Sequence, residues 1–175
     1  DRIFISTIHG FCQWLLEAFP DAHDYGPFLQ VLDERAQYLF ILSHLKDLGI
    51  GRGKGKLGDC LSEIIAVFNA YSEELVDPAK LVEARRASAA DPDEVAVAEA
   101  YGRYRDLLKE ERLLDFAGLQ REAYRILSDN RSVRDAIQAR FDYVMVDEFQ
   151  DTNVIQDRIL SLVAAPEFNL CVVGD

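Results

Sequence analysis

The sequence predicts an α/β fold in which a parallel sheet of about three strands carries a large all-helical insertion. Three short apolar runs have the length and composition of buried strands: residues 2–6, 143–146 and 170–173. The stretch between the first two runs shows helical periodicity and helix-capping residues instead. We therefore expect residues 1–20 and 113–175 to form one α/β domain, into which residues 21–112 are inserted as a helical subdomain.

The N-terminal stretch is expected to be a short buried strand followed by an amphipathic helix. After the apolar run "RIFIS", apolar residues recur every fourth position from Phe11 to Phe19, which predicts a helix over about residues 10–19. Pro20 ends this helix because proline has no backbone N–H to donate. We expect Phe11 and Trp14 to belong to the core.

Four aspartates mark the starts of helices in the central stretch. Each precedes a helical pattern, and two of them precede a proline at the first helical position: Asp33, Asp59, Asp77 and Asp91. The helix after Asp33 is expected to run to Leu48 and to end at Gly49. Two apolar stripes then predict the buried faces of the helices: residues 61, 64, 65, 68, 71 and 75, and residues 97, 101, 104 and 108.

The C-terminal third returns to an α/β pattern. Asp115 is expected to cap a helix that places Phe116 and Leu119 in the core, and a second helix is expected over residues 131–140. The run "YVMV" is apolar on both faces, as in an inner parallel strand. A helix over about residues 153–164, begun by the capping-box spacing of Asn153 and Gln156, then leads to the strand "LCVV".

Composition limits the possible classes of protein. The 49% apolar content supports a sizeable core, and the net charge of −12 restricts any binding of nucleic acid to a local groove. The three cysteines are far apart in the sequence, which favours reduced thiols in a cytoplasmic protein over a disulfide framework or a zinc site. No membrane-spanning run or signal peptide is expected. Both ends look like cuts through a longer protein.

Two adjacent acids follow the strand at residues 143–146. An Asp-Glu pair at the carboxyl end of a buried strand is the Walker B arrangement of nucleotide hydrolases. In that arrangement Asp147 holds Mg²⁺, and Glu148 orients and deprotonates the water that attacks the γ-phosphate of ATP. If the pair is considered alone, the alternative is that Asp147 and Glu148 are ordinary polar residues of a loop.

Ten consecutive residues, "VMVDEFQDTN", extend this pattern into a long motif. It resembles motif II of the superfamily 1A DNA helicases, the UvrD/Rep/PcrA group that includes RecB and AddA. "STIHGFC" resembles the T-[FI]-H-[SG]-F motif of the same family, and its "TIHGFC" part is most similar to the RecB and AddA form of the motif. "LCVVGD" resembles the start of motif III. The resemblance implies part of a RecA-like P-loop NTPase sheet, in an enzyme that couples Mg²⁺-dependent ATP hydrolysis to single-stranded DNA translocation and duplex unwinding in repair or recombination.

The same resemblance assigns the remaining site residues. Thr7 and His9 are expected to contact the DNA backbone. Gln150 and Asp151 correspond to positions that couple ATP to DNA or to the second motor domain, although Asp151 is equally suited to a helix N-terminus. Asp175 belongs to the nucleotide site through motif III. "LLDFAGLQREA" resembles the segment D-F-[DE]-D-L, but Ala117–Gly118 replaces the usual acids.

One half of an ATP site is missing from the sequence. No G-x-x-x-x-G-K-[ST] phosphate loop occurs, and "GRGKGKLG" lacks both its spacing and its hydroxyl residue. We expect that stretch to be an interhelical loop, in which a contact of Arg52, Lys54 or Lys56 with a DNA phosphate is a hypothesis. The fragment alone is expected to be inactive, and its partners to include the rest of its own motor.

Two alternatives from other classes remain. Asp147, Glu148 and Asp175 would also suit a Mg²⁺-dependent nuclease or phosphatase, because parallel strands can bring these acids together. The other alternative is a non-enzymatic helical interaction module that retains a vestigial motor motif.

Overall fold

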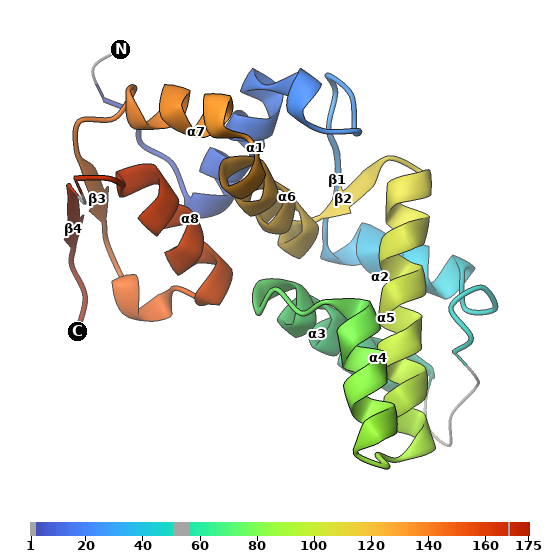
Figure 1. Ribbon diagram of the computed structural model, residues 1–175. Helices are drawn as coiled ribbons and strands as arrows, with labels where there is room; N and C mark the ends of the chain where they lie inside the picture. Colours follow the sequence, from blue (N-terminus) through green and yellow to red (C-terminus); the bar gives the residue numbers. More distant parts are fainter. Residues whose placement is uncertain (1–2, 51–56, 168) are drawn as a thin grey trace. The chain divides into compact units, whose positions relative to one another are not determined.

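A computed structural model describes residues 3–50, 57–167 and 169–175, and it combines helices with short parallel strands (Figure 1). The chain divides into two compact units. One consists of the residues up to Leu29 together with Gly118–Asp175, and the other of Gln30–Ala117. The predicted mixed α/β class with parallel strands is confirmed. The described strands, however, form two separate pairs instead of one sheet of about three strands.

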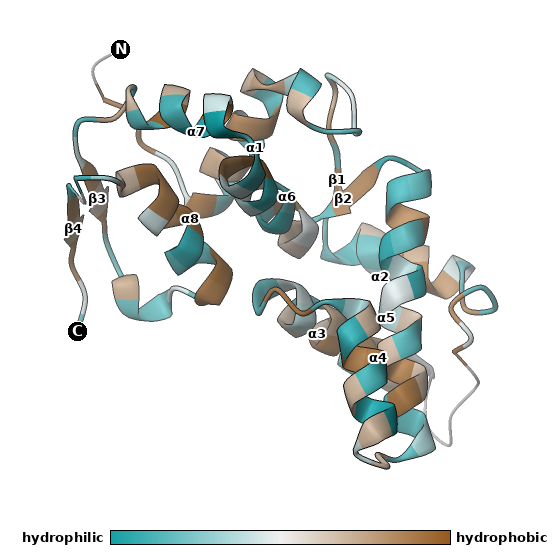
Figure 2. Ribbon diagram, viewed as in Figure 1, coloured by the Kyte–Doolittle hydropathy of each residue, from teal (hydrophilic) through white to brown (hydrophobic). Residues whose placement is uncertain are grey.

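The unit that contains both termini is mainly helical and holds one strand pair. Its elements in chain order are α1 (Ile8–Ala18), the 3₁₀ turn η1 (Pro20–Ala22), α6 (Phe116–Asp129), α7 (Arg131–Gln138), β3 (Val144–Val146), the 3₁₀ turn η2 (Phe149–Asp151), α8 (Val154–Ala164) and β4 (Leu170–Val172). Strands β3 and β4 are parallel, as predicted. Both consist of hydrophobic residues (Figure 2).

The other unit, Gln30–Ala117, is a helical bundle closed by a second parallel pair. Its elements are β1 (Gln30–Leu32), α2 (Glu34–Ser43), α3 (Leu57–Glu73), α4 (Pro78–Ala87), α5 (Pro92–Glu110) and β2 (Leu113–Asp115). The loop that contains Arg52, Lys54 and Lys56 lies outside the described residues. No helix in the described ranges is long and apolar enough to cross a membrane.

Most helix starts follow the predicted capping residues. The side chains of Asp33, Asp77 and Asp91 each accept a hydrogen bond from a backbone N–H two or three residues further on. Asn153 and Gln156 form the predicted capping box. The prediction for Asp59 was wrong: α3 begins at Leu57, so this aspartate lies inside the helix.

Helix α2 ends earlier than predicted. It stops at Ser43, and the chain then turns until Gly49, which has a left-handed φ of +69°. The side chains of Ser43 and His44 both contact the carbonyl oxygen of Phe40, at 2.8 and 2.9 Å. The backbone N–H of His44 also donates to this oxygen, at 3.1 Å, so the two side chains add hydrogen bonds to the carbonyl that accepts from the residue after the helix.

Both predicted apolar stripes form the core of the Gln30–Ala117 unit. Phe68 of α3 and Tyr101 and Tyr104 of α5 are fully buried and contact one another through their rings. Most of the remaining predicted members also pack into this core: residues 61, 64, 65, 71, 97 and 108. The prediction for Leu75 was wrong, because this residue follows the end of α3 with a left-handed φ of +58° and is not part of this core. The helical periodicity was therefore sufficient to identify which faces are buried.

Asp115 is a buried residue. It ends β2, and its Oδ2 accepts hydrogen bonds from the hydroxyl of Tyr104 at 2.7 Å and from Gln37 Nε2 at 3.1 Å. Burial, together with the neighbouring carboxylate, raises the pKa of the Tyr104 hydroxyl, which therefore remains a donor. Leu119 is buried as predicted. The prediction that Phe116 belongs to the core was wrong, because this first residue of α6 is 45% exposed.

The strand predictions were the least accurate. Ile3–Ser6 of "RIFIS" are not a strand, and 89% of the Ile5 surface is exposed. A strand requires a hydrogen-bonded neighbour, and none pairs with this segment in the described part of the chain. Strand β1 was missed, since residues 21–112 had been expected to be all helical. Among the described residues strand β3 pairs with β4 alone. Met145 of this strand is 78% exposed and Tyr143 just before it is 79% exposed, so within the described residues β3 is an edge strand and not the predicted inner strand.

The core of the unit that contains the termini is built around α1 and α8. Cys12, Leu15 and Leu16 of α1 are fully buried. Burial raises the pKa of the Cys12 thiol to about 12, and all three cysteines are free thiols. Phe11 and Trp14 are only half-buried, where they form an aromatic cluster with Phe4 and Phe141.

Candidate functional site

Parallel pairing of β3 with β4 brings two loops to the same end of the strands. Val144 pairs with Leu170 and Val146 with Val172, so both strands end at the same level. Beyond this level Val173 N donates to Val146 O at 2.8 Å, and Phe149 N donates to Val173 O at 2.9 Å. The turn after β3 therefore folds over the end of β4.

This turn carries the two adjacent acids, and its backbone has an unusual conformation. Asp147 and Glu148 are both exposed, and Glu148 N donates to Asp147 Oδ1 at 3.0 Å. Glu148 has a φ of +52°. The other described non-glycine residues with positive φ follow helix ends, where that conformation is common: Leu75, Ala89 and Arg112. A left-handed glutamate directly after a strand costs about 1–2 kcal/mol, which is typical of functional turns.

Gln150 connects the two loops through its side chain. Its Nε2 donates to Glu148 Oε2 at 2.5 Å, and its Oε1 accepts from Asp175 N at 3.3 Å. The amide thereby fixes the Glu148 carboxylate relative to the C-terminal stretch. The structure places Asp147, Glu148, Gln150 and Asp175 together, and Asp151 lies on the same turn, where its N–H donates to Glu148 O.

Gly174 is required by the position of Gln150. A Cβ added at this glycine would lie 2.2 Å from Gln150 Oε1 and 3.3 Å from the backbone nitrogen of Phe149. A Cβ atom essentially never approaches another non-bonded heavy atom to less than 3 Å, so a side chain here must displace the amide of Gln150. We conclude that the small residue at 174 allows Gln150 to cross the C-terminal stretch and reach Glu148.

Replacing Gly174 by alanine is therefore expected to release Gln150 from Glu148 at little cost in stability, because the displaced atom ends a flexible side chain. We expect Gly174→Ala and Gln150→Ala to lower ATP turnover of a longer protein carrying this chain by a similar factor, and the double variant to be no worse than either. A double-mutant cycle measures this coupling. Additive effects would contradict it.

The second motif stretch lies at the start of α1. Thr7 is the N-cap of this helix, and its Oγ1 accepts from Gly10 N at 3.1 Å. The residue is exposed, and the same hydroxyl still carries a hydrogen that can be donated to a phosphate oxygen. His9 is half-buried, and its Nε2 lies 2.6 Å from Nε2 of Gln120 on α6.

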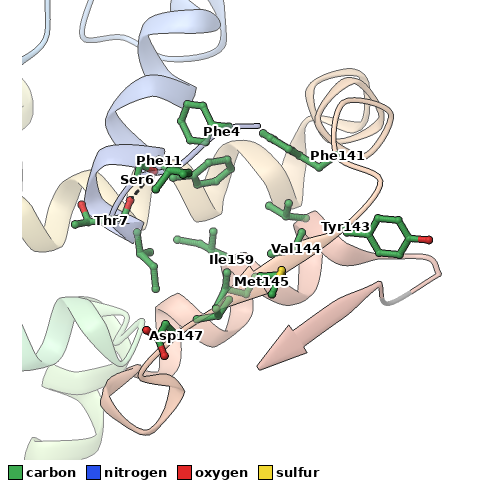
Figure 3. A pocket seen from close by; sticks show the side chains of 15 residues that line it. Phe4, Ser6, Thr7, Phe11, Phe141, Tyr143, Val144, Met145, Asp147 and Ile159 are labelled. Atoms are coloured by element: carbon green, nitrogen blue, oxygen red, sulfur yellow. Dashed lines mark hydrogen bonds between the residues drawn. The ribbon is translucent and has the colours of Figure 1, made fainter. Parts of the chain in front are cut away.

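An apolar groove of about 410 Å³ joins the two motif stretches (Figure 3). The segment before α1 forms one wall, and β3 with α8 forms the other. Thr7 and Asp147 both line it, although they are far apart in the sequence. Most of the remaining lining is aromatic or aliphatic and includes Phe4, Phe141, Met145 and Ile159. Polar groups from both motifs therefore border one groove.

The acids fit a magnesium ion that is shared with a phosphate ligand. Mg²⁺ usually keeps several waters and binds one or two carboxylates together with substrate phosphates. The exposed carboxylate of Asp147, at the end of a strand, is an oxygen ligand of this kind. Among the described residues no group of three His, Cys, Asp or Glu side chains is arranged to hold a metal by itself.

Sequence reasoning missed the contact of Gln120 in this region and the capping role of Thr7. Gln120 is 1% exposed and contacts His9 across 111 residues of sequence, and no local pattern identifies such a pair. The capping role of Thr7 had a local signal, because a threonine directly before a helical pattern is a preferred N-cap. Gln120 lies within the quoted stretch "LLDFAGLQREA", so the structure links two of the motif-like segments.

Comparison with known proteins places the whole chain in one family. Residues 1–175 match the family model of the UvrD/REP helicase N-terminal domain. A "Probable DNA helicase II homolog" of Mycoplasma capricolum subsp. capricolum is 32% identical over 98% of this chain and 23% of its own length. The ATP-dependent DNA helicase PcrA of Bacillus subtilis is 30% identical over all of this chain and 23% of its own length.

A similar relation holds for PcrA of Staphylococcus aureus, which is 30% identical over 99% of this chain and 23% of its own length. The chain thus spans about a quarter of the length of these relatives. The family match covers all four motif-like stretches, including the acids after β3 and the histidine of α1. The chain belongs to the UvrD/REP helicase family and corresponds to its N-terminal domain.

Proposed function

We propose that residues 1–175 are part of an ATP-dependent DNA helicase that couples Mg²⁺-dependent ATP hydrolysis to translocation on single-stranded DNA and unwinding of duplex DNA. The observation that carries this proposal is the common groove of Thr7 and Asp147. The groove brings the stretch with Thr7, whose hydroxyl can donate to a DNA phosphate, next to the turn with Asp147, whose carboxylate can bind the Mg²⁺ of ATP. The names of the relatives support the same activity.

Each acid after β3 has a separate role in this proposal. Asp147 supplies a carboxylate to the Mg²⁺ that accompanies ATP, and the metal neutralises charge on the phosphates. Glu148 accepts a proton from the water that attacks the γ-phosphate. The hydrogen bond from Gln150 orients the carboxylate of Glu148.

The remaining residues connect hydrolysis with DNA. Thr7 and His9 contact the sugar-phosphate backbone, which requires no base-specific group and suits movement along any sequence. Gln150, with Asp151 and Asp175 beside it, links the nucleotide site to the DNA path or to a second motor domain. Residues 1–20 and 113–175 belong to motor domain 1A, and residues 21–112 form the inserted helical subdomain 1B.

The charge of −12 favours a confined DNA path over a broad basic surface. In such a path a few hydrogen-bond donors, such as the hydroxyl of Thr7, hold the backbone of one strand. The expected salt dependence of DNA binding is therefore weak, because few phosphates are neutralised.

The test compares a longer protein that carries this chain with the 175-residue chain alone. The longer protein is expected to hydrolyse ATP in a Mg²⁺-dependent reaction that single-stranded DNA stimulates, and to unwind a duplex with a single-stranded tail. The isolated chain is expected to show no turnover, because its sequence has no phosphate loop. DNA cleavage that needs Mg²⁺ but no ATP would overturn the proposal, as would ATP turnover by the isolated chain.

A further inference from the structure

Strand β3 has one edge whose backbone groups face away from β4. Val144 N donates to Asn169 O at 2.9 Å, and Val146 O accepts from Val173 N at 2.8 Å. These two residues therefore direct their backbone groups at the β4 side. Because backbone groups of successive strand residues point in alternate directions, Met145 directs its N–H and C=O at the opposite edge. In the described part of the chain no strand pairs with that edge.

The segment Ile3–Ser6, on the other side of the groove, has the same deficit. It has the composition of a strand, and none of residues 3–6 and 143–146 is charged. Yet Ile3 is 76% exposed and Ile5 89% exposed, as are 79% of Tyr143 and 78% of Met145. Proteins usually protect a free strand edge with charges or prolines, because an apolar edge pairs with other chains. These two segments lack such protection.

The two segments run along the groove in the same direction. The rings of Phe4 and Phe141 lie with their centroids 6.0 Å apart near one end. Thr7 and Asp147, which follow the two segments in the sequence, lie toward the other end (Figure 3). Both segments therefore lead toward the candidate site, as parallel strands of one sheet would.

The groove of about 410 Å³ separates the two segments, and its lining is suited to a strand. Ile159, Leu160 and Val163 of α8 contribute aliphatic side chains to it. A strand lying between the segments would pack one face of its side chains on this lining and offer its backbone groups to Met145 on one side and Ile3–Ser6 on the other. Such pairing satisfies backbone groups that a small apolar ligand would leave free.

We infer that this groove is the binding site of an additional β-strand, parallel to β3 and hydrophobic on both faces, which the longer protein supplies from outside residues 1–175. The inference deepens the proposed function and rests on it, because the strand would belong to the rest of the same motor. This chain covers 23% of its relatives, so each of them has about three quarters of its length available to supply such a strand.

One added strand would account for two predictions that failed for this chain. "RIFIS" was expected to be a strand and β3 an inner strand, and each lacks a neighbour on the side of the groove. A strand between them would supply both neighbours. An inner parallel strand is apolar on both faces, which is why we expect the added strand to be a nearly continuous hydrophobic run.

The first test is amide hydrogen exchange of the longer protein without nucleotide or DNA, resolved to single amides by mass spectrometry with electron-transfer fragmentation. The Met145 amide is expected to exchange at least about 100-fold more slowly than in an unstructured peptide, because a paired inner strand must open before it exchanges. Val144 N already donates to Asn169 O, so its amide is the internal control and is expected to be protected too. Faster exchange of Met145 would overturn the inference.

A photo-crosslinker identifies the partner of this edge in the longer protein. Met145→p-benzoylphenylalanine is expected to capture a hydrophobic peptide from outside residues 1–175 of the same polypeptide. Capture of Ile3–Ser6 would show that the two segments pair directly, and capture of a second, isotopically labelled copy would show pairing between molecules. Either result would overturn the inference.

Phe28→p-benzoylphenylalanine is the matched control, because Phe28 is 87% exposed and does not line the groove. It is expected to capture no peptide in common with position 145, and a common peptide would contradict a specific site. Neither measurement uses ATP or DNA. A failure here therefore leaves the proposed activity standing, and a longer protein without helicase activity could still show the added strand.

Discussion

Replacing Glu148 by glutamine in a longer protein that carries this chain is expected to lower the turnover number for ATP by about 10²–10⁴-fold, the usual contribution of a general base. The amide has nearly the same size, and its oxygen can still accept the hydrogen bond that Gln150 donates at 2.5 Å. It cannot take a proton from water. ATP binding is expected to persist, because Asp147 and the phosphate contacts are unchanged.

The measurement is steady-state ATP hydrolysis with saturating single-stranded DNA, together with nucleotide binding by a fluorescent ATP analogue. The matched control is Asp142→Asn, which removes an exposed carboxylate just before the opposite end of β3. This control is expected to retain turnover within about twofold, since surface charges away from a site contribute little. A Glu148→Gln protein that turns over ATP as fast as the control would assign the base to another residue.

Local signals accounted for most of the helical structure. Asp77 with Pro78 and Asp91 with Pro92 marked the starts of α4 and α5, and Asn153 marked the start of α8. A cap depends on residues within one turn of the helix, so the information lies in a few adjacent letters. Helix α2 ends at Ser43, before its apolar pattern stops, and the side chains of Ser43 and His44 bond the Phe40 carbonyl at that point.

Strands were harder to predict because they depend on distant partners. The residues of "RIFIS" favour a strand more than those of Gln30–Leu32. In the described part of the chain, however, Ile3–Ser6 have no strand partner, whereas Gln30–Leu32 pair with Leu113–Asp115. Pairing supplies the hydrogen bonds that a strand needs, and the pairing partner is not encoded in the segment itself. The pair β3 and β4 was predictable because a capped helix connects two apolar runs.

The candidate site was likewise predictable only where the signal is local in the sequence. The adjacent acids could be identified because they follow an apolar run, and a parallel pair was expected to bring Asp175 near them. The bridge from Gln150 to both loops required coordinates, as did the contact of Gln120 with His9. Both contacts are made by the neutral side-chain amides of Gln150 and Gln120, and a glutamine in a sequence does not by itself indicate a functional site. The role of Gln150 in the nucleotide site remains a prediction.

Truncating Phe68 to alanine is expected to lower the free energy of unfolding of the Gln30–Ala117 unit by about 3–5 kcal/mol. Phe68 is 1% exposed, and its ring centroid lies 5.1 Å from that of Tyr104 and 5.6 Å from that of Tyr101. Truncation removes the buried ring and leaves a cavity between α3 and α5. It also loosens Tyr104, whose hydroxyl holds the buried Asp115 carboxylate, so a second interaction weakens together with the packing.

The measurement is urea unfolding of the 175-residue chain followed by far-UV circular dichroism. Phe28→Ala is the matched control, because it is the same chemical truncation at a ring that is 87% exposed. It is expected to change the free energy of unfolding by about 0.5 kcal/mol or less. A loss below about 1 kcal/mol for Phe68→Ala would contradict the close packing of this ring. A loss of about 3–5 kcal/mol would show that the packed rings of Phe68, Tyr101 and Tyr104 are a main source of stability in this unit, since this is a large share of the free energy of unfolding of a domain of this size.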